Sequence, residues 1–173
     1  MSKLTPPLNQ QDHAQGNPDA IVTLVEYGDY QCPHCGRAYP IVKQLQKAFG
    51  RQLLFAFRHF PLSNVHEYAI PAAIAAEAAG RQDRFWEMHD MIFERQDELN
   101  DKALLKFAAA LKLDLPQFKD DLPDPELADK VESNFESGVR SGVNGTPSFF
   151  INGFKYNGGF DYASLKDAIE DEM

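Results

Sequence analysis

Two cysteines separated by two residues form the pair with the clearest chemical potential in this sequence. Cys32 and Cys35 enclose Pro33 and His34, and they are the only cysteines among the 173 residues. The preceding residues 21–27 (IVTLVEY) predict a buried strand, because the run is short and rich in β-branched side chains. Pro33 suits the first turn of a helix, where its fixed φ is already helical. The motif therefore falls where a strand passes into a helix.

This position favours a reactive thiolate. A helix N-terminus presents unpaired N–H groups and a partial positive charge, and both stabilise a thiolate, most strongly at the first cysteine. His34 adds a side chain that can carry a positive charge near neutral pH. Two thiols one helical turn apart can close a small disulfide loop. Because a thiolate attacks disulfide sulfurs and is also a good leaving group, the motif predicts thiol–disulfide exchange.

Two alternatives to redox chemistry stay open for the cysteine pair. It could supply half of a zinc site, but the sequence has no second cysteine pair, and the other histidines show no ligand spacing: His13, His59, His66 and His89. The cysteines could also be unreactive core residues, although Pro-His between them at a strand–helix junction argues against that. We therefore expect no metal and no separate cofactor, only a redox-active disulfide between Cys32 and Cys35.

The elements around the motif predict a βαβ unit. Apolar residues at helical spacing over residues 38–49 indicate an amphipathic helix of about 16 residues. Residues 53–58 (LLFAFR) predict a second strand. A strand, a helix and a strand within about 40 residues favour a right-handed crossover between parallel strands.

The rest of the chain alternates between a helical block and a hairpin. Helices are predicted over residues 68–79, 85–96 and 100–111. Residues 116–122 form a short piece between turn signals, and a long helix begins at Pro125. Asn152-Gly153 between two apolar runs indicates a type I′ hairpin, and Asp161 can cap a last helix. The order is β-α-β, a helical block, α and β-β-α. We expect residues 64–122 to be inserted into a frame of residues 18–63 and 123–173.

The net charge and the distribution of apolar residues disfavour several classes of function. Acidic residues outnumber basic ones by 26 to 17, for a net charge of −9, which disfavours nucleic acids and anionic membrane surfaces as partners. No stretch approaches the roughly 20 apolar residues of a membrane span. Residues 1–17 are polar and lack the apolar segment of a signal peptide, so we expect a flexible arm. As written, the chain is expected in the cytoplasm, or in the periplasm if a signal peptide has been removed.

Four segments carry a resemblance to a known family. GNPDAIVTLVEYGDYQCPHC (residues 16–35) resembles the opening of the DsbA-like thioredoxin-fold thiol:disulfide oxidoreductases. Three later segments agree with it: RHFPL (58–62), FWEMHDMIF (85–93) and GVNGTPSFFING (142–153). The resemblance covers about residues 16–173. It implies an α/β thioredoxin fold (β-α-β / β-β-α) with a helical insertion, which is also the element order derived above.

The resemblance also implies roles for individual residues. Cys32 would be the attacking and leaving sulfur, and Cys35 the buried resolving one. Thr146 and Pro147, after Gly145, resemble the family's cis-proline loop, which faces the disulfide and pairs with the substrate backbone. The alternative is a trans proline that simply opens a strand. Threonine stands at position 146, where some DsbA-like oxidases have valine.

Glu26 is a further candidate, because it interrupts an apolar strand six residues before Cys32. Burial would raise its pKa and let it accept or deliver a proton during exchange, and by resemblance it matches the family's buried acid. The alternative is a glutamate that reaches solvent at the strand end. Arg58 is a candidate charge partner for Glu26. Tyr30 and Phe160 are candidates for an apolar substrate surface.

These observations predict a monomeric thiol:disulfide oxidoreductase of the oxidase type. It would act on cysteines of protein substrates through a mixed disulfide on Cys32, with an unidentified redox partner resetting the disulfide. A reducing compartment would instead favour a reductase or isomerase role. A glutathione-dependent isomerase or transferase on the same fold is a second alternative, although it would not need Cys35. A non-catalytic peptide-binding module is the third.

Overall fold

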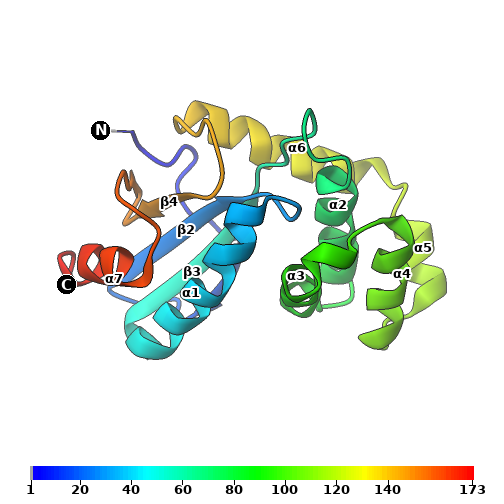
Figure 1. The fold of residues 1–173 in the computed structure, drawn as a ribbon, viewed down its shortest axis with the longest axis horizontal. Coiled ribbons are helices and arrows are strands. Elements are labelled where there is room, and N and C mark those ends of the chain that lie inside the picture. The colour runs from blue at the N-terminus through cyan, green and yellow to red at the C-terminus, as the bar shows by residue number, and fades with distance from the viewer. Residues whose placement is uncertain (1) are drawn as a thin grey trace.

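A computed structural model describes residues 2–173, which form a mixed five-stranded sheet with helices on both faces (Figure 1). The strand order is β1-β3-β2-β4-β5. The strands are β1 (His13–Gly16), β2 (Val22–Gly28), β3 (Leu53–His59), β4 (Ser148–Ile151) and β5 (Phe154–Lys155). β2 and β3 are parallel, as predicted, and the other pairs are antiparallel.

Seven α-helices complete this part of the chain. They are α1 (Pro33–Phe49), α2 (Ala69–Gly80), α3 (Phe85–Glu94), α4 (Asp101–Ala110), α5 (Leu115–Asp121), α6 (Pro125–Arg140) and α7 (Tyr162–Glu170). Short 3₁₀ turns follow α1 at Gly50–Gln52 and α3 at Gln96–Glu98. After the additional strand β1, the element order β-α-β, helices, α, β-β-α agrees with the prediction, with bounds shifted by one or two residues at several helix ends.

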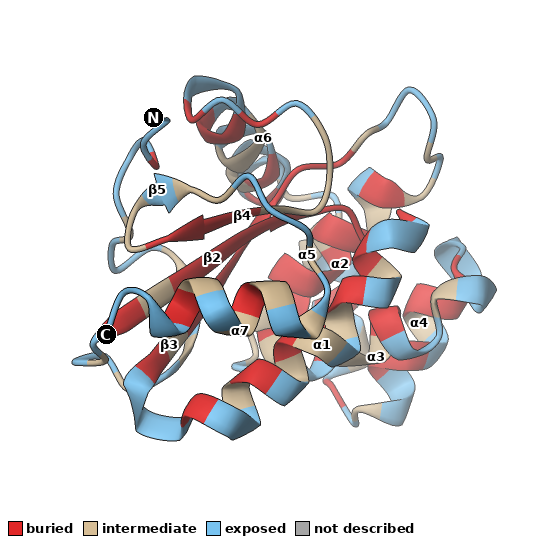
Figure 2. Cartoon of the chain, turned by 60° about the vertical axis from the view of Figure 1, so that its left-hand side comes forward, coloured by how far each residue is buried: buried red, intermediate tan, exposed pale blue. Residues whose placement is uncertain are grey.

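The sheet separates two layers of apolar side chains, because successive residues of a strand point to opposite faces. Leu24 of β2 belongs to the larger buried cluster, whereas its neighbour Val25 belongs to the smaller one. α1 and α7 lie over the face of the larger cluster, and α6 lies over the other (Figure 2). On that second face the ring of Phe135 from α6 stacks on Phe60 with centroids 4.3 Å apart.

α2 to α5 follow β3 and gather at one end of the molecule, beside α1 (Figure 1). Their buried side chains join the same large cluster that covers the sheet. No separate core divides them from the frame among residues 2–173. The division into a frame and an inserted subdomain therefore stays a prediction.

Local signals place the helix starts and the hairpin where the sequence indicated. Asn100, Asp124 and Asp161 each accept a hydrogen bond from a first-turn N–H of α4, α6 and α7. Asn152 and Gly153 both have positive φ, 49° and 84°, as a type I′ turn requires.

The flexible arm expected over residues 1–17 is wrong for the part that the structure describes. β1 pairs with β3 as an edge strand, and the side chain of Leu4 is buried against the smaller cluster. The Leu4 N–H donates to the Gly153 carbonyl at 2.8 Å. The residues of β1 (HAQG) are half-buried or exposed and show no apolar alternation. Their partners on β3 lie about 40 residues away, so no local sequence pattern predicts this strand. Met1 lies outside the described residues.

Across residues 2–173, none of the helices is both long enough and apolar enough to cross a bilayer.

Candidate active site

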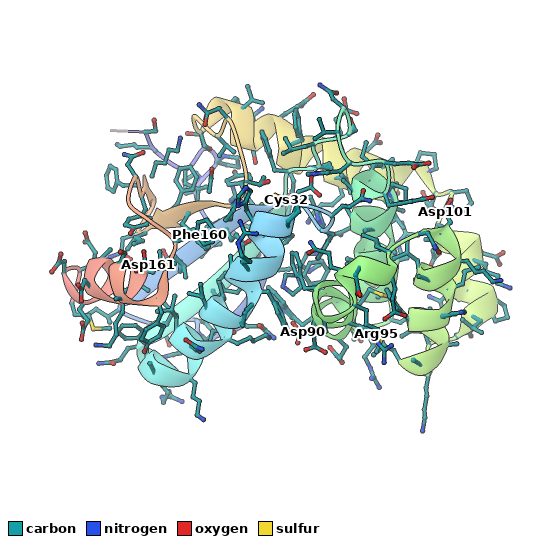
Figure 3. All side chains as sticks on the ribbon, viewed as in Figure 1. Cys32, Asp90, Arg95, Asp101, Phe160 and Asp161 are labelled. Atoms are coloured by element: carbon teal, nitrogen blue, oxygen red, sulfur yellow. The ribbon has the colours of Figure 1, made fainter. Side chains whose placement is uncertain are left out.

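Both cysteines lie at the N-terminal end of α1, directly after the turn that leaves β2. Figure 3 labels Cys32 at this end of the helix. Cys32 is the N-cap residue, and Pro33 occupies the first helical position, as the sequence predicted. Both are free thiols; Cys32 is 4% exposed and Cys35 is fully buried. The cysteine pair therefore sits at a helix N-terminus, where first-turn N–H groups have no intrahelical partner.

Asp29 builds the turn that leads into the motif, and sequence reasoning missed it. Its carbonyl accepts from the Cys32 N–H at 3.1 Å, and its carboxylate accepts from the N–H groups of Gln31 and Leu62, both at 2.8 Å. His66 Nδ1 lies 2.7 Å from the same carboxylate. An acidic residue at the strand end was the available signal, but two of its partners, Leu62 and His66, lie over 30 residues away.

The surroundings of Cys32 favour its thiolate. The pKa of Cys32 falls to about 5, first because the Cys35 thiol donates to it. Thr146 and the backbone N–H groups of Cys35 and His34 lower it further, while partial burial opposes them.

Cys35 has the opposite character. Burial raises its pKa well above the usual value, and its hydrogen bond to Cys32 and the charge of Glu26 act in the same direction. The Asp29 N–H lies 3.4 Å from Cys35 Sγ as a weak donor. The site thus holds one thiolate and one thiol near neutral pH.

Glu26 lies buried in β2 and does not reach solvent, being 2% exposed. Burial, and after it the negative charge of Cys32, raises its pKa to about 8. Among the described residues its Oε2 has no hydrogen-bond partner. A carboxyl group with this pKa can take up and release a proton near neutral pH.

Arg58 is not the charge partner of Glu26, which corrects that expectation. Its guanidinium binds both carboxylate oxygens of Asp12, at 2.8 and 2.9 Å, and donates to the Tyr27 hydroxyl at 2.9 Å. Successive residues of a strand face opposite sides, and Arg58 pairs in register with Tyr27 rather than with Glu26.

The loop before β4 lies against Cys32. The Thr146–Pro147 peptide bond is cis, as the resemblance implied, and the Thr146 carbonyl lies 3.8 Å from Cys32 Sγ. Thr146 Oγ1 is buried and without a hydrogen-bond partner in residues 2–173. The Gly145 carbonyl accepts from Ser148 Oγ at 2.7 Å, which closes the loop onto the start of β4.

The two aromatic candidates for a substrate surface, Tyr30 and Phe160, lie in different surroundings. His34 is exposed, contacts the Arg37 guanidinium through Nδ1, and meets the edge of the Phe160 ring at 6.4 Å between centroids. Phe160 therefore lies beside the active site. Tyr30 does not form an exposed surface: it is 1% exposed and packs on Phe57, because its hydroxyl finds a buried partner in His89 Nδ1 at 2.9 Å.

Two of the other histidines share one carboxylate partner away from the cysteines. His13 and His59 both bind Glu77 Oε2 at 2.8 Å. Over residues 2–173, no three histidine, cysteine or acidic side chains are grouped so as to hold a metal ion.

Comparisons with known proteins agree with this geometry. A family model described as Thioredoxin matches residues 8–171. The oxidised crystal structure of BdbD from Bacillus subtilis superposes with a TM-score of 0.87 at 27% identity, over 99% of this chain and 97% of that one. A thioredoxin-like oxidoreductase from Silicibacter pomeroyi gives 0.82 at 29% identity, over 94% and 92% of the two chains.

Curated relatives match only in part of their length. The chain is 43% identical over 159 residues to the Na⁺/H⁺ antiporter NhaA 1 of Salinispora arenicola, covering 92% of this chain and 24% of that protein. For NhaA 1 of Mycolicibacterium gilvum the figures are 40% identity, 97% and 28%. The chain thus spans about a quarter of the length of the curated relatives that it matches.

The predicted fold and the DsbA-like resemblance are confirmed by these matches. The thiol–disulfide exchange protein α-DsbA2 from Wolbachia pipientis shares the fold, with a TM-score of 0.83 at 22% identity over 94% of this chain and 88% of that one. Because the family match covers nearly all of the sequence, this chain belongs to the thioredoxin family.

Proposed function

We propose that this protein is a thiol:disulfide oxidoreductase that exchanges disulfides with cysteines of other proteins. The observation that carries the proposal is the asymmetry of the two thiols. The pKa of Cys32 lies at about 5, whereas that of its buried neighbour Cys35 is raised. Only one sulfur is therefore a ready nucleophile and leaving group, as exchange through a mixed disulfide requires.

In the reducing direction, the Cys32 thiolate attacks one sulfur of a substrate disulfide. A mixed disulfide forms and the other substrate sulfur leaves as a thiolate. Cys35 then loses its proton, which we assign to the buried Glu26 carboxylate, and attacks Cys32 Sγ. The second substrate sulfur leaves, and the protein carries the Cys32–Cys35 disulfide. The oxidising direction is the reverse, with two electrons moving from the substrate thiols to the protein.

The oxidising direction is supported by the depressed pKa of Cys32. A stabilised thiolate favours the reduced protein, so the disulfide is readily given up to a substrate. A redox partner must then reoxidise the cysteine pair. We also propose that the loop at Gly145, Thr146 and Pro147 receives the substrate backbone, because the Thr146 carbonyl lies against Cys32 Sγ.

The antiporter relatives are named for ion exchange, but this chain matches about a quarter of each. The region of this chain that matches them contains Cys32 and Cys35. We therefore assign disulfide exchange, and not ion exchange, to the matched region of this chain.

An insulin-reduction assay with dithiothreitol tests the proposal. We expect turnover by the wild type and complete loss in Cys32→Ala. Cys35→Ala should also lose turnover while Cys32 still reacts with iodoacetamide, and it should accumulate thiol-sensitive mixed disulfides on non-reducing gels. Turnover that survives in Cys35→Ala would indicate glutathione-type chemistry. An inactive wild type with reactive Cys32 would contradict the proposed function and favour a peptide-binding module.

A further inference from the structure

A glutamine from outside the strand–helix unit holds the turn that carries Cys32. Gln96 follows α3 and is partly buried. Its Nε2 donates to the carbonyl of Tyr30 at 2.9 Å and to the carbonyl of Cys32 at 2.8 Å. Both hydrogens of one amide group are therefore used on the backbone of the active-site turn.

Gly36 makes this contact available. A Cβ atom at position 36 would collide with Gln96 Oε1, whereas the glycine leaves room for the amide beside the first turn of α1. The colliding atoms belong to the far end of a flexible side chain. An alanine at position 36 would therefore displace the Gln96 amide without moving the backbone.

The two carbonyls belong to the turn that carries Cys32. The Cys32 carbonyl also accepts from the Gly36 N–H at 3.1 Å, as the first hydrogen bond of α1. Fixing these carbonyls fixes the Cys32–Pro33 peptide plane, which opens α1, and the Tyr30–Gln31 peptide plane, which lies one residue before Cys32 in the turn. These planes set how Sγ faces the N–H groups of the first helical turn. Donation to the Cys32 carbonyl also offsets a partial negative charge close to Sγ.

We propose that Gln96 is a positioning residue for disulfide exchange, which holds the turn at Cys32 so that the helix N–H groups stabilise its thiolate. The proposal rests on the proposed function, because it names a residue that tunes the same cysteine. It acts through Tyr30 and Cys32 and does not touch the substrate. Removing the amide should destabilise the reduced, thiolate form and leave the disulfide form less affected.

Three variants distinguish a role of Gln96 in positioning Cys32 from a purely structural contact between the end of α3 and the active-site turn. Gln96→Ala removes the amide, and Gly36→Ala displaces it while keeping Gln96. The matched control is Gln82→Ala, since the Gln82 side chain also bonds to backbone, at the N–H and carbonyl of Asp114, away from the cysteines. Each is measured as purified protein by thiolate absorbance at 240 nm against pH, by equilibrium with glutathione, and by urea unfolding.

We expect the midpoint of the Cys32 titration to rise by about one pH unit in Gln96→Ala and in Gly36→Ala, as the loss of one such hydrogen bond implies. The glutathione equilibrium should move about tenfold towards the oxidised protein in both. Gly36→Ala should unfold no more easily than the wild type, because alanine favours a helix interior. Gln82→Ala should change neither the titration nor the equilibrium.

Unchanged titration midpoints in Gln96→Ala and Gly36→Ala, with lowered stability, would overturn the proposal and leave Gln96 a structural link. A shift in Gly36→Ala alone would also overturn it. None of these measurements uses a protein substrate. If wild-type insulin reduction fails while the midpoints shift, only the proposed function is wrong; if insulin is reduced and no midpoint shifts, only the role of Gln96 is wrong.

Discussion

Cys32 and Cys35 are the same residue type within one helical turn, yet their surroundings give their thiols opposite acidities. The Cys35 thiol, Thr146 and the backbone N–H groups of Cys35 and His34 all lower the pKa of Cys32. Burial and the nearby Glu26 carboxylate keep the proton on Cys35. Because the donors to Cys32 include Cys35 itself, the two thiols share one proton between them. Their acidities belong to the pair rather than to either residue alone.

Glu26 should make the folded protein less stable as the pH rises, which Glu26→Gln should relieve. Its folded pKa, about 8, lies above its unfolded value near 4.5, so the folded state holds a proton that the unfolded state has lost between these values. The free energy of unfolding therefore falls across this window. At pH 7 the variant should be more stable than the wild type by about 3 kcal/mol. Urea unfolding of both reduced proteins at pH 5, 6, 7 and 8 measures this.

The difference between the two proteins should shrink to about 1 kcal/mol at pH 5, because the pH there approaches the unfolded pKa near 4.5 and the unfolded state regains part of its proton. A constant difference between them across pH 5–8 would contradict the assignment of a buried, protonated carboxyl group. Slower release of mixed disulfides by the variant would separately support Glu26 as the proton acceptor for Cys35.

Among the single residues of the site, those with a local sequence signal could be predicted, and those whose partners are remote in the sequence could not. The cysteine pair, Glu26 and Thr146-Pro147 each lie in a short recognisable stretch. Asp29 and Gln96 do not. Asp29 bonds to Leu62, and Gln96 to Tyr30, across 33 and 66 residues. A single polar residue gives no sequence pattern that indicates a hydrogen bond to a distant backbone group, so these contacts are found only in the folded structure.

Among the elements, the edge strand β1 and the segment before it depend on one buried ion pair. The side chains of Arg58 on β3 and Asp12, next to β1, are 2% and 7% exposed and share two hydrogen bonds. Arg58 also donates to the Pro7 carbonyl at 3.3 Å. The pair thus fastens the N-terminal segment across the sheet.

Asp12→Ala should lower the free energy of unfolding by about 3 kcal/mol, because it leaves the buried Arg58 guanidinium without its counter-charge. The matched control is Glu98→Ala, which removes an exposed partner of Arg95 and should cost less than about 0.5 kcal/mol. Urea unfolding of both variants at pH 7 makes the comparison. Equal, small losses would show that the N-terminal segment adds little to the sheet.

The helices and the hairpin could be predicted because their signals are local. Asp124 before Pro125, and Asn152-Gly153 between apolar runs, each specify a structure within a few residues. β1 could not, since a four-residue strand, HAQG, becomes a strand only through pairing with β3. Strand pairing over such a distance is decided by tertiary contacts rather than by propensity.

For the molecule as a whole, the redox state and the folded state are coupled. Cys32 and Cys35 belong to the large cluster that also contains buried residues of α2, α3 and α4. Gln96 joins the end of α3 to the active-site turn. Unfolding removes the helix N–H groups, the Cys35 donor and the Gln96 contact together. The thiolate therefore loses its stabilisation in one cooperative step.

The reduced protein should consequently be more stable than the oxidised one near neutral pH. The folded pKa of Cys32, about 5, lies below the unfolded value of about 8.5. A lowered pKa stabilises the folded, reduced form fully above the unfolded value, and this contribution is lost as the pH falls through the folded one. The disulfide opposes it by restricting the unfolded chain, but its loop is short and that entropic effect is small.

At pH 7 we expect the free energy of unfolding of the reduced form to exceed that of the oxidised form by about 2 kcal/mol. This value allows for screening by solvent at the active-site surface. The difference should shrink as the pH falls from 8 to 5. Urea unfolding of both redox forms at pH 5, 6, 7 and 8 measures it, with Cys32→Ala as the control that carries no thiolate. An oxidised form that is more stable at every pH would mean that the fold holds its disulfide, and the protein would then serve as a reductant.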